Sequence, residues 1–154
     1  MQFDRRSLLM APLALGLCGF NQQALPQQWN GGHPEALDPV WNLLSATPTE
    51  TDRKSGLLTA AFPDDVKQLA GKPLKIDGFI LPLEMGRQTL HFVLTRRNAG
   101  CPFCPPSKPT EAIEVLMMDT VQVTGDLITV EGDLVLQSSS SQGMFYQLRK
   151  AKLA

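Results

Sequence analysis

Residues 71–84 read GKPLKIDGFILPLE, and this stretch decides the fold that we predict. Apolar residues alternate with other residues from Leu74 and Ile76 onward, which is typical of a strand with one buried face. Gly78 and Pro82 interrupt the alternation. Because glycine and proline inside a strand mark bends and bulges, the stretch predicts a bent strand at the corner of a small barrel.

The same two-residue period predicts further strands over residues 90–94 and 121–127, and residues 145–148 predict a closing strand. One segment between them is compatible with two structures. Either Thr110 caps a helix there, or Ile113, Val115 and Met117 line one face of a strand. The serine-rich residues 138–143 predict a loop.

Two helix-like segments precede these strands. The first begins at Asp38 and ends before Pro48, and we expect its Trp41 to be a packing anchor rather than a ligand-stacking residue. The second, residues 62–71, has a proline and two acids in its first turn and a glycine at its end. The chain is therefore predicted to be mainly β: a small OB-like β-barrel with a short N-terminal helical lead-in, forming a single domain over residues 35–154.

Residues 1–24 predict an export signal. Arg5 and Arg6 precede an apolar run over residues 7–17, which is too short to span a bilayer at about 20 residues per helix. The arginine pair resembles the twin-arginine signal, whose pathway carries folded proteins across a bacterial inner membrane. Cys18 follows a leucine, whereas a lipoprotein signal needs a small residue there. We therefore expect Cys18 to be removed with the signal.

Charge and composition weigh against several classes of protein. The chain has 14 basic and 15 acidic residues, and removing the signal leaves it slightly more acidic. No basic stripe is left to neutralise phosphates, so nucleic-acid binding is not expected. No stretch after the signal is apolar for long enough to cross a membrane. Residues 25–34 are rich in glutamine, glycine and proline and predict a flexible tether.

The motif CPFCPP at residues 101–106 carries the chemistry of the predicted mature chain. Two thiols at this spacing can form a disulfide, exchange electrons or bind a soft metal. A thioredoxin-type site needs a helix that starts at the motif, and the following prolines oppose that helix. Glu84, Glu111 and Glu114 form no recognisable acid–base pair, so the sequence favours a binding or accessory protein over an enzyme.

A metal site would use Cys101 and Cys104, with His91 as a third ligand. Two thiolates suffice for Cu(I), whereas a closed zinc site takes four ligands. His91 lies on a predicted strand ten residues before Cys101, so a hairpin-like return can bring them together; alternatively, it faces solvent. His33 lies in the tether and is expected to be solvated. The remaining soft donors are methionines, which we expect to fill gaps in the core: Met85, Met117, Met118 and Met144.

The order of several segments resembles that of a known family. These segments are residues 71–84, Phe92-Val93-Leu94, Gly100-Cys101 with the following prolines, Glu114-Val115-Leu116 and residues 121–127. Over roughly residues 60–150 the chain resembles the exported bacterial family catalogued as domain of unknown function 3299. The resemblance implies an OB-like barrel, export and transporter-linked metal handling, chiefly of zinc, and carries over no catalytic activity. Relatives show Cys-x-His before the prolines. Cys101 therefore transfers, a histidine role does not, and Cys104 would have to take its place.

From the residues and the resemblance together, we expect a periplasmic binding or accessory protein that handles zinc or Cu(I) through Cys101, Cys104 and His91. Its expected partner is a membrane transporter or another periplasmic protein. Two alternatives stay open. One is a thiol–disulfide redox protein, and the other is a structural adaptor whose proline-rich loop is held by a disulfide.

Overall fold

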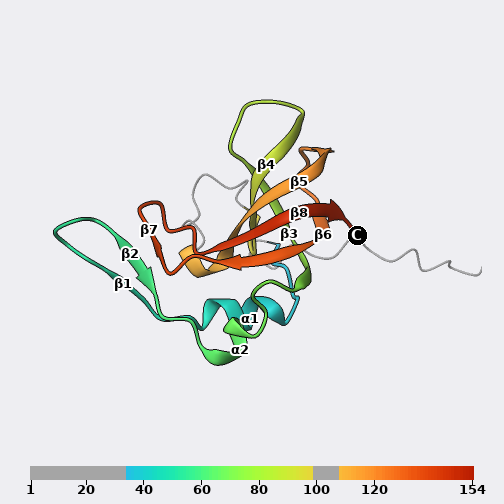
Figure 1. The fold of residues 1–154 in the computed structure, drawn as a ribbon. Coiled ribbons are helices and arrows are strands. Elements are labelled where there is room, and N and C mark those ends of the chain that lie inside the picture. Colours follow the sequence, from blue (N-terminus) through green and yellow to red (C-terminus); the bar gives the residue numbers. More distant parts are fainter. Residues whose placement is uncertain (1–33, 99–107) are drawn as a thin grey trace, which may run out of the picture. The chain divides into compact units, whose positions relative to one another are not determined.

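The computed structural model describes residues 34–98 and 108–154 (Figure 1). In chain order the elements are α1 (Val40–Ser45), β1 (Thr49–Thr51), β2 (Leu58–Ala60), α2 (Asp64–Lys67), β3 (Pro73–Pro82), β4 (Gln88–Thr95), the 3₁₀ helix η1 (Pro109–Glu111), β5 (Ala112–Gln122), β6 (Leu127–Leu136), β7 (Ser139–Ser140) and β8 (Tyr146–Leu153). Within these ranges, every helix is too short or too polar to cross a membrane. The predicted export signal and nearly all of the predicted tether lie outside the described residues.

Five strands close into a barrel in the order β3-β4-β5-β8-β6. The pairs are antiparallel except for β5 and β8, which run parallel. A five-stranded Greek-key barrel of this kind is the OB-type architecture. The prediction of a mainly β, OB-like barrel with short helices before it is therefore confirmed.

The bend predicted in β3 allows this strand to change partners. It pairs with β6 from Pro73 to Phe79, and with β4 from Phe79 to Pro82. Gly78 lies at the change, and a Cβ atom there would come within 2.6 Å of Leu94 Cγ. A side chain at this position would therefore force β3 and β4 apart.

The helix α1 packs against the barrel core. Trp41 and Leu44 are fully buried and belong to the same apolar cluster as the inward-facing barrel residues. Trp41 Nε1 also donates a 2.7 Å hydrogen bond to the Asp77 carbonyl of β3. Trp41 is thus the packing anchor that the sequence predicted. The second predicted helix is shorter than expected, because α2 spans only Asp64–Lys67 before turns lead to Gly71.

The segment that fitted two structures is the strand β5, with Ile113 and Val115 buried in the core. The predicted strand over residues 121–127 is wrong for residues 123–126, because β5 ends at Gln122 and β6 begins at Leu127. The chain turns between β5 and β6, where Thr124 Oγ1 bonds the Asp126 carboxylate at 2.7 Å and accepts the Asp126 N–H at 3.1 Å. Such side-chain bonds to nearby backbone favour a turn over a continuing strand.

The predicted loop over residues 138–143 also needs correction. Ser139–Ser140 forms β7, which pairs with β2, and β2 in turn pairs with β1 in a small three-stranded sheet. Backbone hydrogen bonds hold β7 in this sheet. Because backbone groups make this pairing, the strand needs no apolar side chains. The serine-rich sequence has no hydrophobic pattern that would have predicted it.

Tyr146 provides a direct probe of the packing between α1 and the barrel. Its hydroxyl lies 2.9 Å from the Leu44 carbonyl and 2.7 Å from Thr47 Oγ1, at hydrogen-bond distance from both. Burial raises the pKa of Tyr146 above its usual value of about 10. Because Tyr146 is the only tyrosine in the chain, tyrosinate absorbance reports on this residue alone.

We expect the tyrosinate absorbance of the folded protein to appear at higher pH than that of the denatured protein, which should titrate near pH 10. The free energy of unfolding should be pH-independent with respect to this group below about pH 10, and should fall as the pH rises further. An absorbance titration with and without denaturant measures both curves. Coincident curves would contradict the burial of this hydroxyl.

Lys150 is a strained position in β8. Its φ of 51° is the only positive value at a non-glycine residue within the described ranges. It lies where the β6–β8 register shifts between Glu131 and Asp133. The left-handed conformation costs a non-glycine residue about 1–2 kcal/mol.

We therefore expect Lys150→Gly to raise the free energy of unfolding by up to about 1 kcal/mol, since glycine's larger unfolded-state entropy cancels part of the relief. Lys152→Gly, in the same strand but without positive φ, is the matched control and should lower it by about 0.5–1 kcal/mol. Denaturant unfolding curves compare the two. Equal destabilisation by both substitutions would show that Lys150 is not strained.

Candidate functional site

The predicted site residues fall into two groups. Cys101 and Cys104, like His33 and Cys18, lie outside the described residues. His91 lies in β4, with its side chain 40% exposed on the outer face of the barrel. The structure therefore describes one of the three predicted ligands and the strands on either side of the cysteine-bearing segment.

The four methionines differ in their environments. Met117 packs against the core, as expected for a residue that fills gaps. Met85 and Met118 are exposed, so the core prediction is wrong for these two. Met144 is partly buried.

Backbone hydrogen bonds hold the chain on both sides of the segment 99–107. At the end of β4 the Arg96 N–H donates to the Glu111 carbonyl at 3.1 Å. The stretch before α1 lies along the same backbone, because the Ala36 N–H donates to the Arg96 carbonyl at 2.8 Å and the Asn98 N–H donates to the Pro34 carbonyl at 3.1 Å. Both ends of the segment are thus held by regular pairing.

A cluster of four charges reinforces this junction. The Glu111 side chain is only 5% exposed, and its Oε1 lies 3.9 Å from both the Arg96 and the Arg97 guanidinium groups. Both arginines also contact Glu35, the Arg96 contact being an ion pair at Nε without the alignment of a hydrogen bond. A nearly buried carboxylate needs such cationic partners, so we interpret the cluster as a structural support for the segment ends.

His91 belongs to a row of polar side chains across the outer face of the barrel. Its Nε2 lies 2.8 Å from Glu114 Oε1 in β5. The other oxygen of Glu114 accepts a 2.6 Å hydrogen bond from Gln147 Nε2 in β8, and Gln147 Oε1 accepts one from Arg149 Nε at 2.5 Å. We call these four residues the polar row.

The sequence did not reveal the polar row. One of its two alternatives, the strand, put Ile113 and Val115 on one face and hence Glu114 on the other, but neither alternative indicated the partners of Glu114. Glu114 lies opposite Val93 and opposite Gln147 in the two ladders, so it is a diagonal neighbour of His91. Only the strand register brings these residues together. Within the described ranges no three His, Cys, Asp or Glu side chains are grouped so that they could hold a metal ion.

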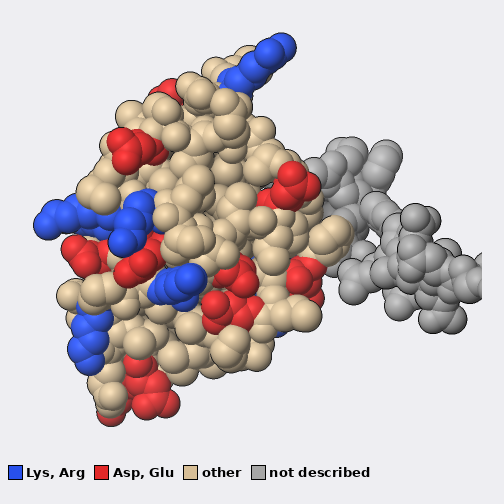
Figure 2. Space-filling model, turned by 90° about the vertical axis from the view of Figure 1, so that its right-hand side faces the viewer, with Lys and Arg blue, Asp and Glu red and all other residues tan. Residues whose placement is uncertain are grey.

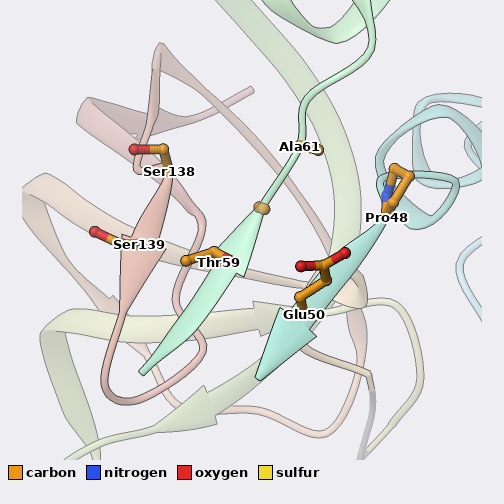
Figure 3. Close-up of a pocket in the computed structure, with 7 residues that line it drawn as sticks. Pro48, Glu50, Thr59, Ala61, Ser138 and Ser139 are labelled. Carbon is orange, nitrogen blue, oxygen red and sulfur yellow. The ribbon is translucent and has the colours of Figure 1, made fainter. Parts of the chain in front are cut away.

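Away from the polar row, the small sheet borders a hollow of about 440 Å³ (Figure 3). Its lining is small and mostly uncharged: Pro48, Glu50, Thr59, Ala60, Ala61, Ser138 and Ser139. Glu50 is the only titratable side chain there, so this hollow offers no acid–base or metal-ligand set. The face seen in Figure 2 carries basic and acidic side chains close together rather than a patch of one sign.

Comparisons with known proteins agree on one family. The model of the family described as "Protein of unknown function (DUF3299)" matches residues 23–154. The crystal structure of a DUF3299 family protein from Pseudomonas aeruginosa PAO1 is similar, with a TM-score of 0.50, 21% sequence identity, and coverage of 80% of this chain and 85% of that chain. At this identity the likeness concerns the fold alone. No curated protein matches the chain. Since the family match extends over most of its length, the chain belongs to the DUF3299 family, as its sequence resemblance indicated.

Proposed function

We propose that this chain is an exported periplasmic binding or accessory protein that handles zinc or copper. Cys101, Cys104 and His91 are the proposed ligands. Thiolate and imidazole ligands suit zinc, and two thiolates alone suffice for Cu(I). Three protein ligands on zinc would leave one coordination position open, which suits a protein that passes its metal to a partner such as a membrane transporter.

The environment of His91 is the observation that carries this proposal. Metal-ligating histidines commonly donate one ring N–H to a carboxylate and use the other nitrogen for the metal. The 2.8 Å contact between His91 Nε2 and Glu114 Oε1 has this form. The side chain of His91 is also 40% exposed, so a metal ion can approach it from outside the barrel.

The proposal requires the cysteine-bearing segment to run back along the outer face of β4 and β5. His91 is four residues from Thr95 at the end of β4, which corresponds to about 13 Å of strand. Cys104 is four residues before Lys108, and four residues span at most about 14 Å. A zinc site that includes both His91 and Cys104 therefore requires the stretch 104–108 to be nearly extended and directed toward His91.

The test is metal stoichiometry in reduced full-length protein. We expect Cys101→Ser and Cys104→Ser each to abolish stoichiometric binding of Zn²⁺ or Cu⁺, because each removes one of two thiolates. Cys18→Ser is the matched control, since Cys18 lies in the predicted signal and its loss should leave binding unchanged. Elemental analysis after gel filtration gives the metal-to-protein ratio.

Stoichiometry that is unchanged in both Cys101→Ser and Cys104→Ser would overturn the assignment of the site. The redox alternative would gain support if the reduced protein bound no metal and one thiol titrated well below the usual pKa of about 8.5. An unreactive disulfide that is difficult to reduce would instead support the structural adaptor.

A further inference from the structure

The polar row has an internal order that the proposed function does not explain. His91, Glu114 and Gln147 lie on three neighbouring strands, β4, β5 and β8. Each alternates with core residues, which places all three on the outer face. In OB-type barrels, ligands bind on the outer face of the second and third barrel strands, which correspond here to β4 and β5.

Every polar atom between Arg149 and His91 has an assigned role. Arg149 Nε is a donor, so the Gln147 atom that it contacts at 2.5 Å is the amide oxygen. The amide nitrogen of Gln147 therefore faces Glu114 and donates to Oε2 at 2.6 Å. The remaining oxygen, Oε1, faces His91. Arg149 thus fixes the orientation of Gln147, and Gln147 fixes that of Glu114.

Burial makes this orientation difficult to change. Gln147 is 7% exposed and the Glu114 side chain is 21% exposed. Turning a carboxylate with so little access to water away from its hydrogen-bond donors raises the free energy of the folded protein. The end of the row at His91 is more accessible, with a side chain that is 40% exposed.

The order of donors determines which nitrogen of His91 carries the proton. An ionised carboxylate only accepts hydrogen bonds, so His91 Nε2 must be the protonated nitrogen. In the neutral ring Nδ1 then holds the electron pair. Within the described part of the chain Nδ1 makes no hydrogen bond.

We infer that Glu114, held by Gln147, is a positioning residue that presents Nδ1 of His91 as a ligand for a divalent metal ion on the outer face of the barrel. The metal part of this inference rests on the proposed function. The positioning part concerns the metal-free protein and is tested without metal.

Glu114→Gln gives a sharp test because it keeps the shape and changes the hydrogen-bond pattern. The new amide must turn its oxygen toward the donor of Gln147, so its NH₂ group faces His91. Nε2 then has to accept a hydrogen bond, and the proton moves to Nδ1. We expect the ¹⁵N chemical shifts of His91 to show Nε2–H in the unsubstituted protein and Nδ1–H in this variant. A His33→Gln background leaves His91 as the only histidine.

The double exchange Glu114→Gln with Gln147→Glu should restore the original tautomer. The new carboxylate at position 147 accepts from both Arg149 and the new amide, which then turns its oxygen toward His91. A residue with a merely structural role would show no such rescue. Glu131→Gln is the matched control, because Glu131 also contacts a cross-strand partner, Lys152, at 3.6 Å but lies outside the polar row.

Zn²⁺ affinity of the reduced full-length protein provides the second readout. We expect Glu114→Gln to weaken Zn²⁺ binding by about 10- to 100-fold, the double exchange to recover it, and Glu131→Gln to leave it unchanged. An Nδ1–H tautomer in the unsubstituted protein would overturn the inference.

The two proposals fail in different ways. Zn²⁺ binding that depends on Cys101 but is unaffected by Glu114→Gln would overturn the inference and leave the proposed function standing. Absence of metal binding in the unsubstituted protein would overturn the proposed function and, with it, the assignment of Nδ1 as a metal ligand.

Discussion

The close approach of β3 and β4 at Gly78 is the constraint on which the rest of this structure depends. A Cβ atom at Gly78 would lie 2.6 Å from Leu94 Cγ, so only a glycine in β3 leaves room for the buried side chain of Leu94 in β4. Because β3 changes partner from β6 to β4 immediately after Gly78, the same residue allows the sheet to close. Closure in turn gives β4 and β5 the fixed outer face that carries His91 and Glu114.

Much of the barrel could be predicted from the sequence because its strands obey a local rule. The apolar alternation in β3 and β4 shows which face is buried, whereas the pattern around Ile113 and Val115 of β5 was compatible with a helix as well as a strand. The failures occurred where backbone pairing or local side-chain bonds determine the structure. The turn at Thr124 interrupts a segment whose apolar period continues through it, so the pattern predicted a strand there. The pairing of Ser139 with β2 has no hydrophobic period, so the pattern could not show it.

The candidate site was less predictable for a related reason. The cysteine motif, Cys101 and Cys104, can be recognised in the sequence, but its chemistry depends on its surroundings. The polar row can be recognised only in the structure, because it depends on the register of three strands. Register is a property of the closed barrel, and an isolated glutamate between two apolar residues does not reveal which neighbour it will meet. A membership in the DUF3299 family fixes the fold without assigning either part.

The hydrogen bond from the Asn98 N–H to the Pro34 carbonyl, 3.1 Å long, has a consequence for where attachments to this protein would act. Two points of the chain that are far apart in sequence emerge at one corner of the barrel: residue 34, to which the N-terminal segment connects, and residue 98, after which the cysteines follow. A label or crosslinker placed at Pro34 would therefore report on the surroundings of residue 98. A partner that binds the protein near residue 34 would also contact the surroundings of residue 98, which is three residues before Cys101 in the sequence.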